Sequence, residues 1–199
     1  MGFSLFYRLE SALQMKNRQN KSPKALVIYN QLINFFWSTL AFTPVIYFCI
    51  QHLPLNVLYW FLLISCAVIF VPTSWLARIR LSKSQHLYRK IGVRFIKKYT
   101  QDGDLVNNIV KNSHPEYRYI ESKQSFKKVL AKSAINEKFH YLVFVFFLCL
   151  GIYAFFKGLI AWGIFISLAN VAYNIYPIFL QQYNRIRINL LMLRRNNIQ

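Results

Sequence analysis

The feature that most constrains this chain is a set of four apolar runs, which occupy residues 25–50, 55–77, 139–156 and 159–180. A helix needs about 20 mostly apolar residues to cross a bilayer, and only helices and closed barrels satisfy their backbone polar groups there. Hydrophobic residues make up 55% of the 199 residues. We therefore predict an all-α, polytopic membrane protein: one integral membrane domain over residues 1–199, with about four transmembrane helices in two hairpins.

The charged residues indicate how these helices are oriented. The chain has 25 Lys and Arg against six Asp and Glu, a formal net charge of +19. Nucleic-acid binding would also explain such a charge, but it is not favoured because the cations flank runs that suit a bilayer. Only Lys157 lies between the third and fourth runs, while all other cations lie on the opposite side. By the positive-inside rule, both termini and the basic segment 78–138 are predicted to be cytoplasmic, in the cell (inner) membrane.

Segments outside the runs combine apolar and basic residues. Residues 1–24 and 86–99 each predict an amphipathic helix on the membrane surface, in contact with membrane lipid. The Asp102-Gly103-Asp104 sequence predicts the end of the second of these helices, and His114-Pro115 predicts another turn. Residues 122–138 predict a further basic helix that leads into the third run.

The stretch 170–187, which begins in the fourth run and ends beyond it, carries polar side chains that a helix would place on one face: Asn170, Asn174, Gln181 and Arg185. Amides at this depth are costly unless they face other helices or a cavity, so they indicate an interior-facing site. Alternatively, they only form hydrogen bonds that join helices. Pro177 has no N–H, so we expect a kink just before it.

His140 is the strongest candidate for a general base. It lies near the start of the third run, and Glu137 precedes it by three residues, so both lie on the same helical side. A carboxylate that orients an imidazole is typical of a catalytic base. The alternative is an interfacial histidine with a capping glutamate. No metal site is expected, because the remaining histidines lack partners at ligand spacing: His52, His86 and His114.

Three segments together resemble a known family. The C-terminal run Asn174-x6-Gln181-x-Tyr183-Asn184-Arg185-x-Arg187 resembles the signature of the glycosyl-diaponeurosporenoate acyltransferase family, small bacterial membrane proteins of staphyloxanthin-type carotenoid synthesis. Glu137-x-x-His140 and the segment 87–94 are similar to two further parts of that family, and the resemblance covers roughly residues 85–195. Some positions depart from the signature: Gln182 replaces an arginine, Ile186 replaces a proline, and Pro177 lies one place later than expected.

The resemblance implies a membrane O-acyltransferase. Such an enzyme moves a fatty acyl group from a thioester donor, acyl coenzyme A or acyl carrier protein, to a hydroxyl of a lipid-embedded acceptor such as a glycosylated carotenoid or glycolipid. Besides this co-substrate it implies no cofactor. His140 would be the base and Glu137 its partner. The substrate-binding residues would be Asn174, Gln181, Tyr183, Asn184, Arg185 and Arg187.

Two classes of function therefore remain open on the sequence alone. The alternative to an acyltransferase is a non-enzymatic membrane subunit or scaffold, which would bind anionic lipid or a partner protein through its basic cytoplasmic face. A scaffold should tolerate the loss of Glu137 and His140, whereas the enzyme should not.

Overall fold

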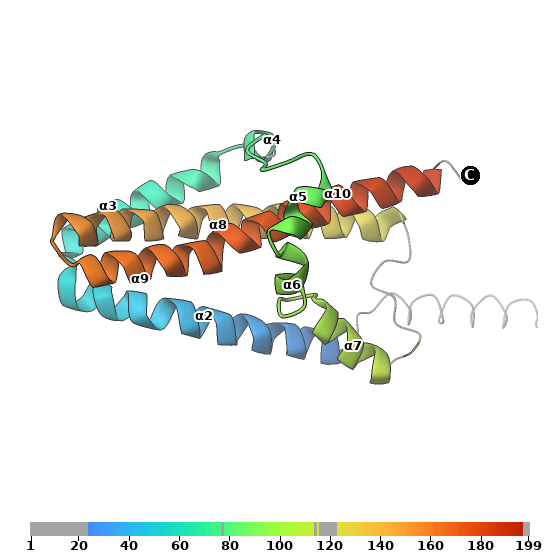
Figure 1. Ribbon diagram of the computed structural model, residues 1–199, viewed down its shortest axis with the longest axis horizontal. Helices are drawn as coiled ribbons and strands as arrows, with labels where there is room; N and C mark the ends of the chain where they lie inside the picture. The colour runs from blue at the N-terminus through green and yellow to red at the C-terminus, as the bar shows by residue number, and fades with distance from the viewer. Residues whose placement is uncertain (1–23, 77, 114, 116–122, 197–199) are drawn as a thin grey trace, which may run out of the picture.

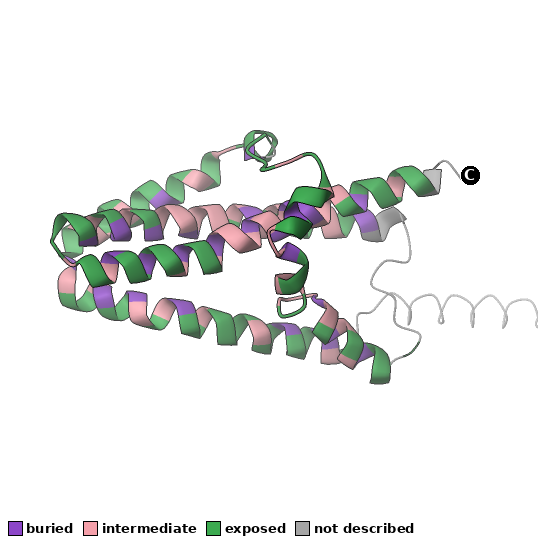
Figure 2. Cartoon of the chain, viewed as in Figure 1, coloured by how far each residue is buried: buried purple, intermediate pink, exposed green. Residues whose placement is uncertain are grey.

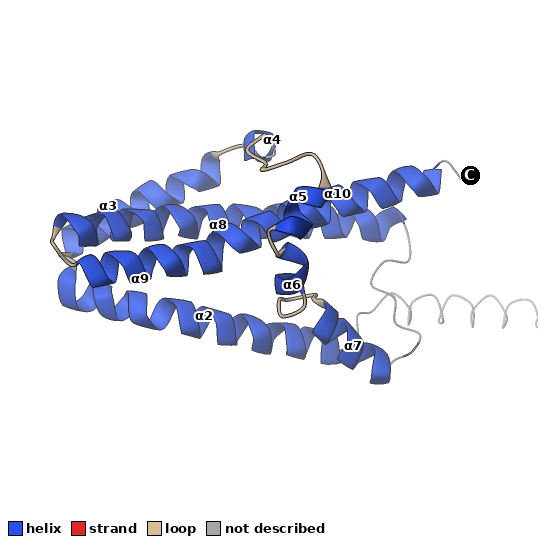
Figure 3. Ribbon diagram, in the orientation of Figure 1, coloured by secondary structure: helices blue, strands red, loops and turns tan. Residues whose placement is uncertain are grey.

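A computed structural model describes residues 24–76, 78–113, 115 and 123–196 (Figure 1). All but one residue of the helix expected over 1–24 lies outside this part of the chain, as does His114 of the expected turn. Every regular element among the described residues is a helix, and no strand occurs among them (Figure 3). The all-α class is therefore confirmed.

Three helical stretches are long and apolar enough to cross a membrane: Lys24–His52, Phe126–Phe156 and Ile160–Arg194. The first is α2 (Lys24–His52) and the second belongs to α8 (Lys123–Phe156). The third consists of α9 (Ile160–Asn170), the π-helical turn η2 (Val171–Ile175) and α10 (Tyr176–Asn196). The basic helix expected over 122–138 is the first half of α8 and continues into the span without a break.

The second expected span is shorter than the sequence suggests. Helix α3 (Leu55–Cys66) tightens into the 3₁₀ turn η1 (Ala67–Phe70), and the short α4 (Thr73–Leu76) is separate. Pro72 explains the break, since the residue before a proline avoids the α conformation and Val71 is extended, with φ −68° and ψ 124°. The apolar helix Leu55–Phe70 is therefore shorter than the expected 55–77.

The basic segment folds back onto α10. The single helix expected over 86–99 is in fact α5 (Gln85–Lys90) and α6 (Val93–Lys97), because Gly92 between them adopts a positive φ of 83°. Tyr88 and Val93 are completely buried against Leu180 of α10. The predicted break at Asp102-Gly103-Asp104 is present, and α7 (Asp104–Ser113) follows it.

The main apolar cluster joins α2, α3, α8 and α9 towards the turn between α8 and α9. At its other end α2 is held by Asp102, whose backbone N–H and carboxylate bond to the Asn30 amide at 2.8 Å and 2.7 Å. Lys132 of α8 pairs with the same carboxylate at 2.5 Å. Much of α2 and α3 is exposed (green in Figure 2), and many of the exposed residues are large and apolar, as on a lipid-facing surface.

Candidate functional site

The polar residues of the last span lie at and beyond the π-helical turn η2. Pro177 has no N–H to donate to the carbonyl of Tyr173, so the regular α-helical bonding cannot continue through this point. Just before Pro177, where a kink was expected, the structure has a π-helical turn over Val171–Ile175. Such turns are frequent at functional sites, and they insert one residue into the helical repeat.

Two asparagines connect this turn to α8. Asn170 is 5% exposed and its amide N–H donates to the backbone carbonyl of Phe144 at 3.1 Å. Asn174 is fully buried and donates to Asn170 Oδ1 at 2.8 Å. Asn174 Oδ1 lies 3.5 Å from His140 Nδ1.

The direction of this chain of hydrogen bonds determines the tautomer of His140. A backbone carbonyl only accepts hydrogen bonds, so Asn170 must turn its N–H to Phe144 and its oxygen to Asn174. The Asn174 amide N–H is then used by Asn170, and its oxygen is left facing the imidazole. His140 therefore carries its proton on Nδ1, which leaves Nε2 without a proton.

An aromatic contact also positions this histidine. The ring of Tyr173 meets the His140 ring edge-on, with centroids 5.8 Å apart. The Tyr173 hydroxyl lies 3.0 Å from the Ser38 hydroxyl, so this tyrosine also connects the π turn to α2.

Glu137 is buried, but its partners differ from the one expected. Its carboxylate is 2% exposed and receives Arg185 Nη1 at 2.9 Å and Nη2 at 3.3 Å. The Gln182 amide N–H also donates to it, at 3.2 Å. Among the described residues, Glu137 forms no hydrogen bond with His140, and the predicted pairing of these two is replaced by Glu137 with Arg185 and His140 with Asn174.

Gln182 is the functional candidate that the sequence reasoning missed. It is 2% exposed, and its oxygen accepts from the Leu81 N–H at 3.2 Å and the Tyr88 hydroxyl at 2.9 Å. Its N–H group faces the Ile79 carbonyl at 3.1 Å, in addition to Glu137. The helical repeat pointed to Gln181 instead. The residue inserted at the π turn moves the inward-facing position one place later, from 181 to 182. In the sequence, the replacement of the signature arginine by Gln182 was the feature that could have indicated this residue.

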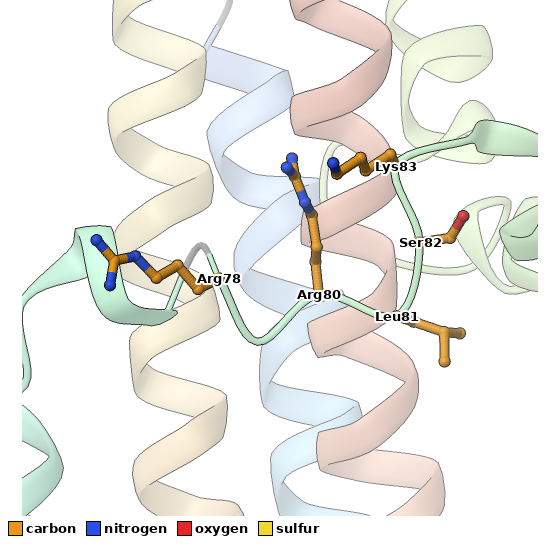
Figure 4. A pocket seen from close by; sticks show the side chains of 5 residues that line it. All are labelled: Arg78, Arg80, Leu81, Ser82 and Lys83. Atoms are coloured by element: carbon orange, nitrogen blue, oxygen red, sulfur yellow. The ribbon is translucent and has the colours of Figure 1, made fainter.

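The loop 78–83 is held against the two long helices by these contacts. Tyr141 of α8 donates to the Ile79 carbonyl at 3.1 Å, and the Ser82 N–H donates to the Tyr88 hydroxyl at 3.1 Å. Burial raises the pKa of the Tyr88 hydroxyl, so it remains a neutral hydrogen-bonding group. The loop borders an open depression of about 560 Å³ (Figure 4), lined by Arg78, Arg80, Leu81, Ser82 and Lys83.

Two polar clusters result: His140 with Asn170 and Asn174, and Glu137 with Gln182 and Arg185. The other predicted residues of α10 lie outside both. Gln181 is half-buried and accepts from the Ser133 hydroxyl at 2.9 Å. Tyr183 is buried and packs its ring near that of Tyr88. Asn184 is half-buried and Arg187 is exposed, and within the described residues neither forms a side-chain hydrogen bond. The structure thus brings together His140 with Asn174, and Glu137 with Arg185.

A family model described as glycosyl-4,4'-diaponeurosporenoate acyltransferase matches residues 72–194 of this chain. The chain belongs to this family. No curated protein and no solved structure matches it. The matched region contains both polar clusters and the loop 78–83, whereas α2 and α3 lie before it. The family name indicates a carotenoid-related acyltransferase.

Proposed function

We propose that this protein is a membrane O-acyltransferase that moves a fatty acyl group from a thioester donor to a hydroxyl of a lipid-embedded acceptor, a glycosylated carotenoid or a glycolipid. The observation that carries the proposal is the chain of hydrogen bonds from the Phe144 carbonyl through Asn170 and Asn174 to His140 Nδ1. A catalytic histidine needs one ring nitrogen that donates a hydrogen bond to a fixed acceptor and a second ring nitrogen without a proton. These hydrogen bonds favour that arrangement.

In the proposed reaction, Nε2 of His140 takes the proton of the acceptor hydroxyl as its oxygen attacks the thioester carbonyl. The tetrahedral intermediate then collapses, the C–S bond breaks, and the leaving thiolate takes the proton back from the imidazole. Asn174 acts as a positioning residue, since it holds the protonated nitrogen as a carboxylate does in other catalytic triads. The 3.5 Å distance to Asn174 is long for a hydrogen bond, and such contacts commonly shorten when substrate is bound.

The Glu137–Arg185 pair has a different part in this proposal. It joins α8 to α10 one helical turn from His140, at a separation of about 4.5 Å along α8. A guanidinium has five N–H groups, and two of those of Arg185 are used by Glu137. The remaining donors, on a side chain that is 21% exposed, are available to an anionic part of the substrate.

Membrane orientation follows from the charge distribution and is part of the same proposal. With Lys157 outside and the other cations inside, His140 lies near the cytoplasmic boundary of α8. A lipid-borne hydroxyl can arrive there from the bilayer and a water-soluble thioester from the cytoplasm.

The test compares lipid products of a strain that lacks the gene after complementation with wild type, His140→Ala or His86→Ala. His86 is an exposed histidine of α5 and serves as the matched control. General-base catalysis is typically worth about 10²–10⁴-fold, so His140→Ala should abolish the acylated product at unchanged expression. His86→Ala should retain it. Product at the wild-type level in His140→Ala membranes, measured by mass spectrometry, would exclude this mechanism and favour a scaffold.

A second variant separates catalysis from helix packing. Asn174→Leu removes the acceptor of His140 Nδ1 but suits the bilayer. If Asn174 positions the base, the variant should insert and express normally yet lose most product. If Asn174 only joins helices, the same change should lower the amount or the melting temperature of the purified protein.

A further inference from the structure

The loop 78–83 forms the basic depression described above, and nothing in the catalytic scheme accounts for it. Its three cationic side chains are Arg78, Arg80 and Lys83. In Figure 4, the side chains of Arg80 and Lys83 extend to the same end of the loop, while Arg78 points to the other side. The depression has no acidic lining residue.

The described carboxylates are all engaged elsewhere. They belong to Asp102, Asp104 and Glu137, which pair with Lys132, Lys97 and Arg185 respectively. Within the described residues, no ion pair therefore neutralises the cations of the loop. A depression with two such cations at one end, Arg80 and Lys83, attracts an anion more strongly than isolated lysines on a helix do.

The backbone of this loop is fixed before any ligand arrives. Gln182, which is 2% exposed, binds both the Leu81 N–H and the Ile79 carbonyl. Tyr88, which is completely buried, binds the Ser82 N–H. A loop held in this way loses less conformational freedom when it binds a ligand, so its cations bind more tightly than those of a free loop.

The loop also bonds to the helical turn of α8 that carries the proposed base. The Ile79 carbonyl accepts from the hydroxyl of Tyr141, the residue that follows His140 in α8. The loop and His140 are therefore attached to the same turn of that helix. Because consecutive residues of a helix point in different directions, a ligand held by the loop reaches the imidazole only through a flexible arm.

We propose that the depression binds the phosphate groups of a pantetheine-linked acyl thioester, the donor of the transfer reaction. This inference rests on the proposed function. Arg80 recognises phosphate through paired N–H donors and Lys83 through a point charge. The chemistry is shared by acyl coenzyme A and by the phosphopantetheine group of an acyl carrier protein. The other anion that a basic site at a membrane can bind is a lipid headgroup.

The experiment measures binding directly, on full-length protein in nanodiscs of phosphatidylcholine. The probes are coenzyme A, a phosphopantetheinylated acyl carrier protein, and pantetheine, which has no phosphate. The variant Arg80→Gln/Lys83→Gln is compared with Lys127→Gln/Lys128→Gln, an exposed pair on α8 that removes the same charge. The loop variant should bind coenzyme A or the carrier protein at least about tenfold more weakly, because charge-assisted hydrogen bonds are lost. The control variant should bind both normally, and pantetheine binding should not differ between the variants.

Loss of affinity for coenzyme A or for the carrier protein supports the proposal and names the donor. Equal affinities in the two variants for both phosphorylated probes would overturn it. Binding to vesicles that contain phosphatidylglycerol is measured for the same two variants. If the loop variant loses only this binding, the depression is a headgroup site and the proposal is overturned. Binding is read without turnover. A protein that binds the donor through this loop but transfers no acyl group would refute the proposed function and not the phosphate site.

Discussion

Replacing Gln182 with Leu should lower the thermal stability of the protein far more than the same replacement at the neighbouring Gln181. Gln182 lies within 3.2 Å of five partner groups in the loop 78–83, in α5 and in α8. An amide has two N–H groups and two acceptor lone pairs, so it forms at most four of these bonds at once. Among the described residues, the Gln181 side chain forms one hydrogen bond, in which its oxygen accepts from Ser133.

The expected magnitudes follow from these counts. A protein hydrogen bond contributes about 1 kcal/mol net, and a buried polar group left without a partner costs about 1–3 kcal/mol. Leu at 182 removes four bonds and leaves the carboxylate of Glu137, which is 2% exposed, with one partner fewer. We expect a loss of about 4–6 kcal/mol, equivalent to roughly 10–20 °C in the melting temperature of a chain of this length. Gln181→Leu should cost about 1 kcal/mol, or about 2–4 °C, because Ser133 keeps its bond to the Gln181 carbonyl.

The assay is thermal unfolding of the two purified variants in one detergent, followed by tryptophan fluorescence. Limited trypsin digestion adds a local measurement, since Arg80 and Lys83 are cleavage sites in the loop that Gln182 anchors. Cleavage there should accelerate in Gln182→Leu and not in Gln181→Leu. Equal melting temperatures for the two variants, or a larger decrease for Gln181→Leu, would refute the placement of Gln182.

Three other outcomes are expected. A reporter fused at Lys157 should lie outside the cell and one at the C-terminus inside, and the same side for both would contradict the positive-inside orientation. Glu137→Gln and Arg185→Leu should each lower the melting temperature, because either change leaves the other charge without its partner. Each single decrease should exceed half of the decrease in the double variant, whereas single decreases that add up to that of the double variant would argue against the pair. Asp102→Ala should cost about 1–2 kcal/mol in unfolding experiments, because the Asn30 amide N–H and Lys132 lose their carboxylate partner while the bond from the Asp102 backbone N–H to Asn30 remains, and an unchanged melting curve would contradict this anchor.

The long helices could be predicted from the sequence because hydropathy and charge act over whole segments. The three long helical stretches, in α2, in α8 and from α9 to α10, contain the first, third and fourth apolar runs. The boundaries that the sequence analysis misplaced depend on single residues. Pro72 ends the second helix, and the positive φ of Gly92 divides the amphipathic segment into two short helices.

The candidate site was only partly predictable. His140 and Asn174 were identified because a basic or amide side chain within an apolar run is unusual, and Glu137 and Arg185 because helical spacing puts them on the same side as these or neighbouring polar residues. Their pairing was not predictable. A regular helical repeat assumes one residue per 100°, and the π turn over 171–175 changes which face each later residue occupies. Nothing in the sequence spacing distinguishes Gln181 from Gln182 once that turn is present.

The signature arginine that Gln182 replaces gives a final test of how this chain is adapted. Arginine has no acceptor, so Gln182→Arg would leave the Leu81 N–H and the Tyr88 hydroxyl without the oxygen they now bond to. It would also place a second guanidinium beside Arg185, where Glu137 is the carboxylate in contact and both its oxygens are already used. We therefore expect Gln182→Arg to melt well below the wild type, and Gln181→Arg, on a half-buried side chain, to melt close to it. Wild-type stability in Gln182→Arg would mean that Glu137 accommodates both guanidiniums and that the loop 78–83 does not depend on the amide oxygen.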